Sequence, residues 1–135
     1  MSRAAVACLL ALAAAGCGGG DDDSQDAGAP AVDLTVTLRP DGPDGEAQTH
    51  RIECEQVGAD ASTEVCKGLA GVKPEQLEPV PANVACTQIY GGPAVARVKG
   101  TLHGKPVDAR FALSDGCEIE RWDRNRVLLD DAPAG

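Results

Sequence analysis

Residues 86–93, Cys-Thr-Gln-Ile-Tyr-Gly-Gly-Pro, are the stretch of this chain whose residue types best fit a chemical role. A cysteine stands at one end and a proline at the other, and Tyr90 between them is the only tyrosine in the chain. A disulfide can pin Cys86, and the ring of Pro93 fixes φ. Such a segment is suited to being held extended in front of a partner, so these residues predict a presented loop.

No other residues in the sequence have the types and spacing of a catalytic centre. The two histidines, His50 and His103, have no serine or cysteine beside them. Neither a glycine-rich phosphate loop nor a Gly-x-Ser-x-Gly elbow occurs. Asp130 and Asp131 lie in a terminal segment, where rigid acid–base geometry is not expected. We therefore expect a protein that is not an enzyme and has no cofactor.

The net charge of -9 argues against nucleic acid as a partner.

The N-terminus predicts export. Residues 4–15 form an apolar stretch that is too short to span a bilayer comfortably, and Arg3 precedes it. The small residues directly before Cys17 resemble a bacterial lipobox, in which the cysteine is lipidated and becomes the mature N-terminus. We expect a signal peptide over residues 1–16 and a lipid anchor on Cys17 that holds the protein on the outer face of the bacterial cell membrane. An ordinary secretory signal, cut at the alanines, is the alternative.

The remaining chain divides by composition into a linker, one domain and a tail. Residues 17–30 are rich in glycine and aspartate, which predicts a flexible acidic linker after the lipidated cysteine. Residues 31–130 are expected to form one small domain, and residues 131–135 a frayed tail.

Four cysteines in this domain predict two disulfides, because exported proteins meet an oxidising environment. The four cysteines are Cys54, Cys66, Cys86 and Cys117, and they allow three connectivities. A zinc site is the competing interpretation. The sequence has no Cys-x-x-Cys pair and only two histidines, so we expect no metal.

Alternation of apolar and polar residues predicts the strands. The predicted strands lie in two hairpins, residues 32–38 with 47–55 and residues 94–102 with 107–113. Between the hairpins, Asp60, Ser62 and Thr63 offer N-cap oxygens ahead of a short helix at 64–69. Pro74 begins one further turn at 73–77.

After the second hairpin, Ser114-Asp115-Gly116 is expected to form a turn, and Ile119 and Trp122 to close the core. The predicted fold class is α+β. It consists of a single antiparallel β-sheet of four to five strands with one or two short helices on one face and two disulfides.

The segment from Leu34 to Trp122 resembles the Streptomyces-type subtilisin inhibitor-like family of serine protease inhibitors. The matching residues are Leu34-Thr35-Val36, Cys54, Cys66, Cys86-Thr87-Gln88-Ile89-Tyr90 with Pro93, Val98-Lys99-Gly100 followed by Gly104-Lys105, and Cys117-Glu118 after Asp115-Gly116. The cysteine order and the Cys-x-x-Ile-Tyr block are specific when they occur together.

The resemblance implies disulfides Cys54–Cys66 and Cys86–Cys117. It also implies a reactive-site peptide bond between Gln88 and Ile89, with Gln88 as the P1 residue. The implied protease-contacting loop comprises Ala85, Cys86, Thr87, Gln88, Ile89 and Tyr90. The implied partner is a subtilisin-like or trypsin-like serine protease, and a homodimer is the implied assembly. A serine protease binds an extended substrate by strand addition, and a loop already held in that shape loses little entropy on docking.

The chain departs from the family in the loop itself. Two glycines, Gly91 and Gly92, separate the tyrosine from the proline where the family usually has one residue. Glycine is the most flexible residue, so the pair is expected to loosen this side of the loop. Thr87 replaces the proline that is frequent at P2, and Gln88 is neither large and apolar nor basic.

These departures leave two functions open. One is a membrane-anchored protease inhibitor that acts through the Gln88–Ile89 bond. The other is a non-inhibitory envelope lipoprotein or binding module that keeps the inhibitor fold. An exposed, ordered loop favours the first, and a loop in which Ile89 and Tyr90 pack against the domain favours the second.

Overall fold

The computed structural model describes residues 29–130. The predicted signal peptide, the lipidation site Cys17 and the tail at 131–135 lie outside the described residues, as does the linker apart from its last two residues. None of the helices in the described part of the chain is long and apolar enough to cross a membrane.

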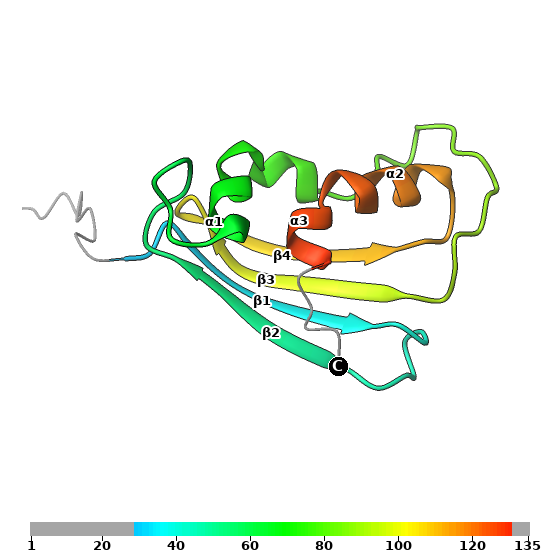
Figure 1. Ribbon diagram of the computed structural model, residues 1–135. Helices are drawn as coiled ribbons and strands as arrows, with labels where there is room; N and C mark the ends of the chain where they lie inside the picture. Colours follow the sequence, from blue (N-terminus) through cyan, green and yellow to red (C-terminus); the bar gives the residue numbers. More distant parts are fainter. Residues whose placement is uncertain (1–28, 131–135) are drawn as a thin grey trace, which may run out of the picture.

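Four strands form one open antiparallel sheet, as predicted. The strands are β1 (Val32–Arg39), β2 (Gln48–Cys54), β3 (Val95–Leu102) and β4 (Lys105–Ala112). They lie in the order β2-β1-β3-β4, so the two hairpins meet along β1 and β3 (Figure 1). The register of β1 with β3 pairs Val36 with Val98, which brings the apolar positions of both strands to the same face.

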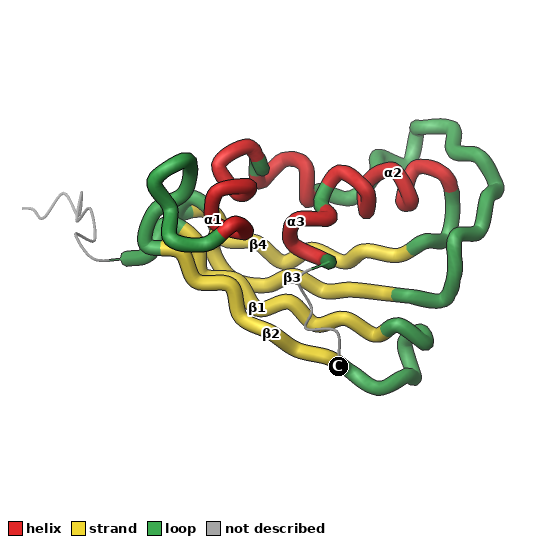
Figure 2. The backbone as a smooth tube through the Cα atoms, in the orientation of Figure 1, coloured by secondary structure: helices red, strands yellow, loops and turns green. Residues whose placement is uncertain are grey.

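The core lies between this face and a layer of short helices. Alternate residues of the strands are buried: Val32, Leu34 and Val36 on β1, with Val98 and Leu102 on β3, have no exposed surface. The helical layer contributes Leu69, Leu77, Trp122, Leu128 and Leu129. Figure 2 shows the helices gathered on one side of the sheet. The face covered by the helices is thus the one that carries the alternate apolar residues of the strands.

The predicted helix begins where its cap indicates. It is α1 (Glu64–Gly68), and Thr63 Oγ1 accepts a hydrogen bond from the Cys66 N–H at 3.3 Å. Two 3₁₀ turns follow, η1 (Leu69–Gly71) and η2 (Pro74–Leu77), the second starting at the predicted proline. Cys66 is buried, and its sulfur lies 3.8 Å from Glu53 O on β2.

Two helices follow the second hairpin, where a turn was expected. Gly116 is not the end of a turn, because it begins α2 (Gly116–Arg124), and α3 (Arg126–Leu129) follows. Asp115 caps α2, its Oδ1 accepting from the Glu118 N–H at 3.0 Å. Trp122 is buried, as predicted, and Ile119 is half-buried. The predicted α+β class is confirmed, with three helices in the described chain rather than one or two.

The cysteines form two disulfides with the pairing that the family resemblance implies. Cys54 is bonded to Cys66 and Cys86 to Cys117. The first bond ties α1 to the end of β2. The second ties the segment before β3 to the first turn of α2.

Candidate functional site

The predicted loop lies between η2 and β3, at one end of the sheet. Residues 85–92 have neither helical nor strand structure, and residues 79–96 include no charged side chain. Figure 1 shows this segment projecting beyond the ends of β3, β4 and α2. The loop is therefore an uncharged protrusion on a molecule whose surface is otherwise rich in charge.

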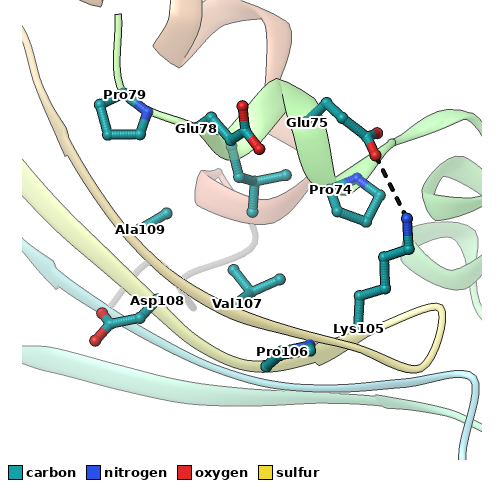
Figure 3. Close-up of a pocket in the computed structure, with 10 residues that line it drawn as sticks. Pro74, Glu75, Glu78, Pro79, Lys105, Pro106, Val107, Asp108 and Ala109 are labelled. Atoms are coloured by element: carbon teal, nitrogen blue, oxygen red, sulfur yellow. Dashed lines mark ion pairs between the residues drawn. The ribbon is translucent and has the colours of Figure 1, made fainter.

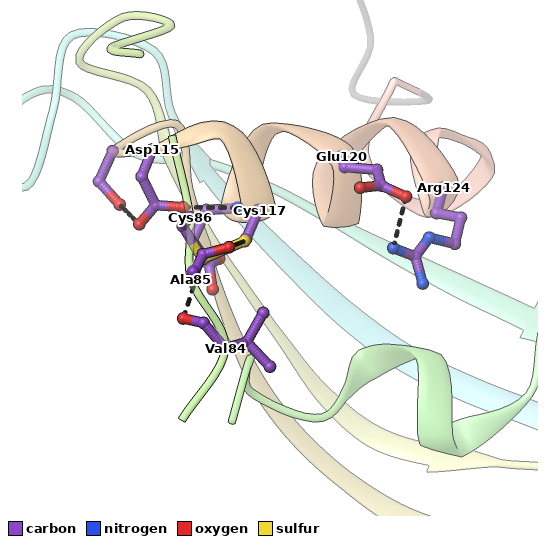
Figure 4. The surroundings of a disulfide bond; sticks show 9 residues. Val84, Ala85, Cys86, Asp115, Cys117, Glu120 and Arg124 are labelled. Atoms are coloured by element: carbon purple, nitrogen blue, oxygen red, sulfur yellow. Dashed lines mark hydrogen bonds and ion pairs between the residues drawn. A yellow bond between two sulfur atoms is a disulfide. The ribbon is translucent and has the colours of Figure 1, made fainter. Parts of the chain in front are cut away.

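One side of the loop is anchored to α2. The Cys86–Cys117 disulfide joins it to the first turn of that helix (Figure 4). One residue later, Thr87 O accepts a hydrogen bond from the Gly116 N–H at 2.9 Å. That N–H belongs to the first helical turn, where backbone donors have no partner inside the helix. The loop thus satisfies a donor that α2 leaves free.

The other side of the loop is anchored to the end of β4. The Gly91 N–H donates to Leu113 O at 2.7 Å. A Cβ added at Gly91 would lie 2.9 Å from Ile119 Cδ1 and 3.2 Å from Leu113 Cβ, so the backbone passes close over these side chains. Gly92 follows with a φ of 131°, which favours glycine. The expectation that both glycines loosen this side is therefore wrong for Gly91, which is bonded and packed.

Three residues stand between the two anchors. Gln88, Ile89 and Tyr90 are all exposed, Ile89 to 59% and Tyr90 to 68%. With Val84, these two are the exposed large hydrophobic residues of the described chain, and all three lie within this one segment. Singly exposed hydrophobic residues are common, but a cluster on a protruding loop is typical of a protein-binding surface.

The other sequence candidates do not assemble into a site. His103 lies in the β3–β4 turn, with Nε2 at 2.9 Å from Val72 O. His50 lies half-buried on β2, and its two ring nitrogens have no partner among the described residues. Cys86, Asp115 and Cys117 lie close enough together to suggest a metal site. Both sulfurs are in the disulfide, however, so neither can act as a thiolate ligand.

A hollow of about 390 Å³ lies between η2 and the outer edge of β4 (Figure 3). At its wall an ion pair joins Lys105 to Glu75 at 3.5 Å. The edge of β4 is poorly suited to receive a further strand. Pro106 has no N–H, and Arg110 O already accepts from Arg121 Nη1 at 2.7 Å.

Comparison of the chain with protein-family models, with curated proteins and with solved structures finds no match.

Sequence reasoning located the loop but missed the residues that support it. Leu113, Gly116 and Ile119 contact the loop only because β4 and α2 meet beneath it. One signal for this junction was present in the sequence, since Asp115 with Glu118 three positions later is the pattern of a helix N-terminus. Nothing in the sequence indicated that Thr87 would pack against Gly116.

Proposed function

We propose that this protein is an exported, membrane-anchored inhibitor of a serine endopeptidase of the subtilisin-like or trypsin-like class. The bond offered to the protease is Gln88–Ile89. The observation that carries the proposal is the loop geometry: Gln88, Ile89 and Tyr90 stand exposed between two anchored sides. A loop that is already extended and fixed binds with a small loss of conformational entropy.

The chemistry of the loop also supports this function. A protease binds about six substrate residues largely through their backbone. A segment without charged side chains places no charge against the enzyme's substrate-binding cleft, so it can dock without charge repulsion. The P1 side chain enters the S1 pocket, and here Gln88 would do so. Glutamine fits neither a large apolar pocket nor an acidic one well, so we expect the wild-type protein to bind common subtilisin-like and trypsin-like enzymes less tightly than its P1 variants do.

Substitution at Gln88 tests the proposal. Gln88→Lys should favour trypsin-like proteases, because a lysine reaches their acidic S1 pocket, and Gln88→Leu should favour subtilisin-like ones. Each variant should inhibit the enzyme class it favours about 10- to 200-fold more strongly than the wild-type protein does, which is the range for one well-fitted pocket contact. Inhibition constants of the purified, oxidised protein against both enzyme classes measure this.

Gln56→Lys is the matched control for Gln88→Lys, since it makes the same change in charge on an exposed residue. Gln56 follows the last residue of β2, at the end of the sheet opposite to the loop. It should leave both inhibition constants unchanged. If the wild type and both Gln88 variants remain folded but bind no protease, the inhibitor proposal fails. The exposed cluster Val84, Ile89 and Tyr90 then favours the alternative, a non-inhibitory envelope binding module.

A further inference from the structure

A single five-residue segment, 113–117, contacts both sides of the candidate loop. Leu113 O accepts from the Gly91 N–H on one side. On the other side the Gly116 N–H donates to Thr87 O, and Cys117 is bonded to Cys86. The contact between Gly116 and Thr87 is the closest of these in steric terms. A Cβ added at Gly116 would lie 1.9 Å from Thr87 Oγ1 and 3.3 Å from Thr87 Cβ.

We infer that Gly116 is a positioning residue of the loop, which holds Thr87 in place through its N–H and through its lack of a side chain. The inference rests on the proposed function, in which Thr87 is the residue before P1. Gly116 has no side chain to offer to a protease. It acts by fixing the backbone of Thr87, and through it the direction in which Gln88 leaves the body of the protein.

The steric reasoning predicts what alanine does at this position. The Thr87 hydroxyl must rotate away from the new methyl group, and a β-branched side chain has few χ1 rotamers to choose from. Even then the two Cβ atoms remain about 3.3 Å apart, which is tighter than ordinary contact. Thr87 must therefore shift away from α2, and its hydrogen bond to the residue 116 N–H lengthens.

Alanine at this position should not weaken the helix. Residue 116 is in the first turn of α2, and alanine favours helix more than glycine does. A loss of loop order without a loss of overall stability is thus the signature that separates positioning from a general structural role.

The test compares Gly116→Ala, Thr87→Ala and the double variant with Gly71→Ala. Gly71 is the control because a Cβ added there meets no atom within 4 Å. In Gly116→Ala, native-state exchange of the residue 116 amide by NMR should accelerate about tenfold, as expected when one backbone hydrogen bond is weakened. The inhibition constant of the protein, in the Gln88→Lys background against trypsin, should rise by a similar factor.

Thr87→Ala removes the hydroxyl that the new methyl group would meet but keeps the Cβ that would lie 3.3 Å away. Exchange in the double variant should therefore be faster than in Thr87→Ala alone, but by clearly less than about tenfold. If Gly116→Ala matches Gly71→Ala in both exchange and inhibition, Gly116 is not a positioning residue. If no variant inhibits trypsin, inhibition of trypsin-like enzymes through this loop is refuted instead, and the exchange data alone then decide whether Gly116 positions the loop.

Discussion

Arg121 is a charged residue buried where three elements meet. Only 5% of it is exposed. Its Nη1 donates to Arg110 O at 2.7 Å and to Glu118 Oε2 at 2.9 Å, and its Nη2 donates to Leu77 O. The guanidinium lies 4.2 Å from the centre of the Phe111 ring. This one side chain therefore joins α2 to β4 and to η2.

We expect Arg121→Ala to be strongly destabilising. It leaves two backbone carbonyls and the Glu118 carboxylate without their donor, and breaking a buried ion pair costs about 3–5 kcal/mol of unfolding free energy. Urea denaturation measures the loss. Arg124→Ala is the matched control on the same helix, because Arg124 pairs with Glu120 on the surface at 3.1 Å and such pairs contribute about 1 kcal/mol or less. Equal losses in the two variants would contradict the role given to Arg121.

At the same scale, the sequence singled out the exposed residues of the candidate loop but not the residues that hold this loop in place. Cys86, Gln88 and Ile89 were identifiable because their types and order resemble a known inhibitor loop. Gly116 was not, since its role depends on Thr87, a residue that approaches it only through the fold. Glycine positions that are required for close approach leave no trace in periodicity, whereas buried strand residues do.

Among the elements, strands were predictable and α2 was not. Buried residues recur at every second position along much of each strand, because one face is covered and the other is in water. The first turn of α2 instead contains Gly116 and Cys117, and Ile119 follows, all weak helix formers. Its stability comes from the Asp115 cap and from the burial of Trp122 and Arg121, so it is fixed by tertiary packing more than by propensity.

The uncovered face of the sheet carries two ion pairs between neighbouring strands. Arg51 donates two hydrogen bonds to Asp33, both at 2.8 Å, and Arg97 donates two to Asp108, both at 2.9 Å. Hydrogen bonding by Arg51 holds the pKa of Asp33 below its usual value, and Arg97 does the same to the pKa of Asp108. Both carboxylates are thus more stable as anions in the folded sheet than in the unfolded chain.

The stability of the fold should therefore fall in acid, because protonation of Asp33 and Asp108 breaks these two ion pairs. A carboxyl whose pKa is lowered by folding contributes fully above its unfolded value of about 3.9, and the contribution is lost as pH falls through the folded value. The double variant Asp33→Asn with Asp108→Asn should lose less stability between about pH 7 and about pH 3 than the wild type, measured by urea denaturation. The control is Asp41→Asn with Asp44→Asn, two exposed hairpin residues that make no ion pair in the described chain. If this control reduces the loss of stability in acid by as much as the double variant does, the cross-strand ion pairs do not cause that loss.

Across the whole molecule, the start of the domain and the candidate loop lie at opposite ends of the sheet. Ala31 is held beside β2 and the β3–β4 turn, where its N–H donates to Glu55 O and its carbonyl accepts from the His103 N–H. The loop is held at the other end, where β3 begins and β4 finishes. An eight-residue strand such as β1 spans about 26 Å. A chain anchored at Cys17 would therefore enter the domain at the end of the sheet opposite to the loop.

This arrangement predicts that anchoring and inhibition are independent. Cys17→Ala removes the predicted site of lipidation, so the protein should move from the membrane fraction to the culture medium, because buried acyl chains contribute about 0.8 kcal/mol per methylene to membrane binding. The Gln88→Lys protein with and without this change should inhibit trypsin with constants that agree within about threefold, since the chain enters the domain at the end of the sheet opposite to the loop. Fractionation and inhibition of vesicle-bound and released protein measure both quantities.

Wild-type protein found only in the medium, at the mass of an unmodified chain, would refute the anchor. A markedly weaker constant for the bound form would show that the bilayer obstructs the loop, contrary to its placement at the far end of the sheet.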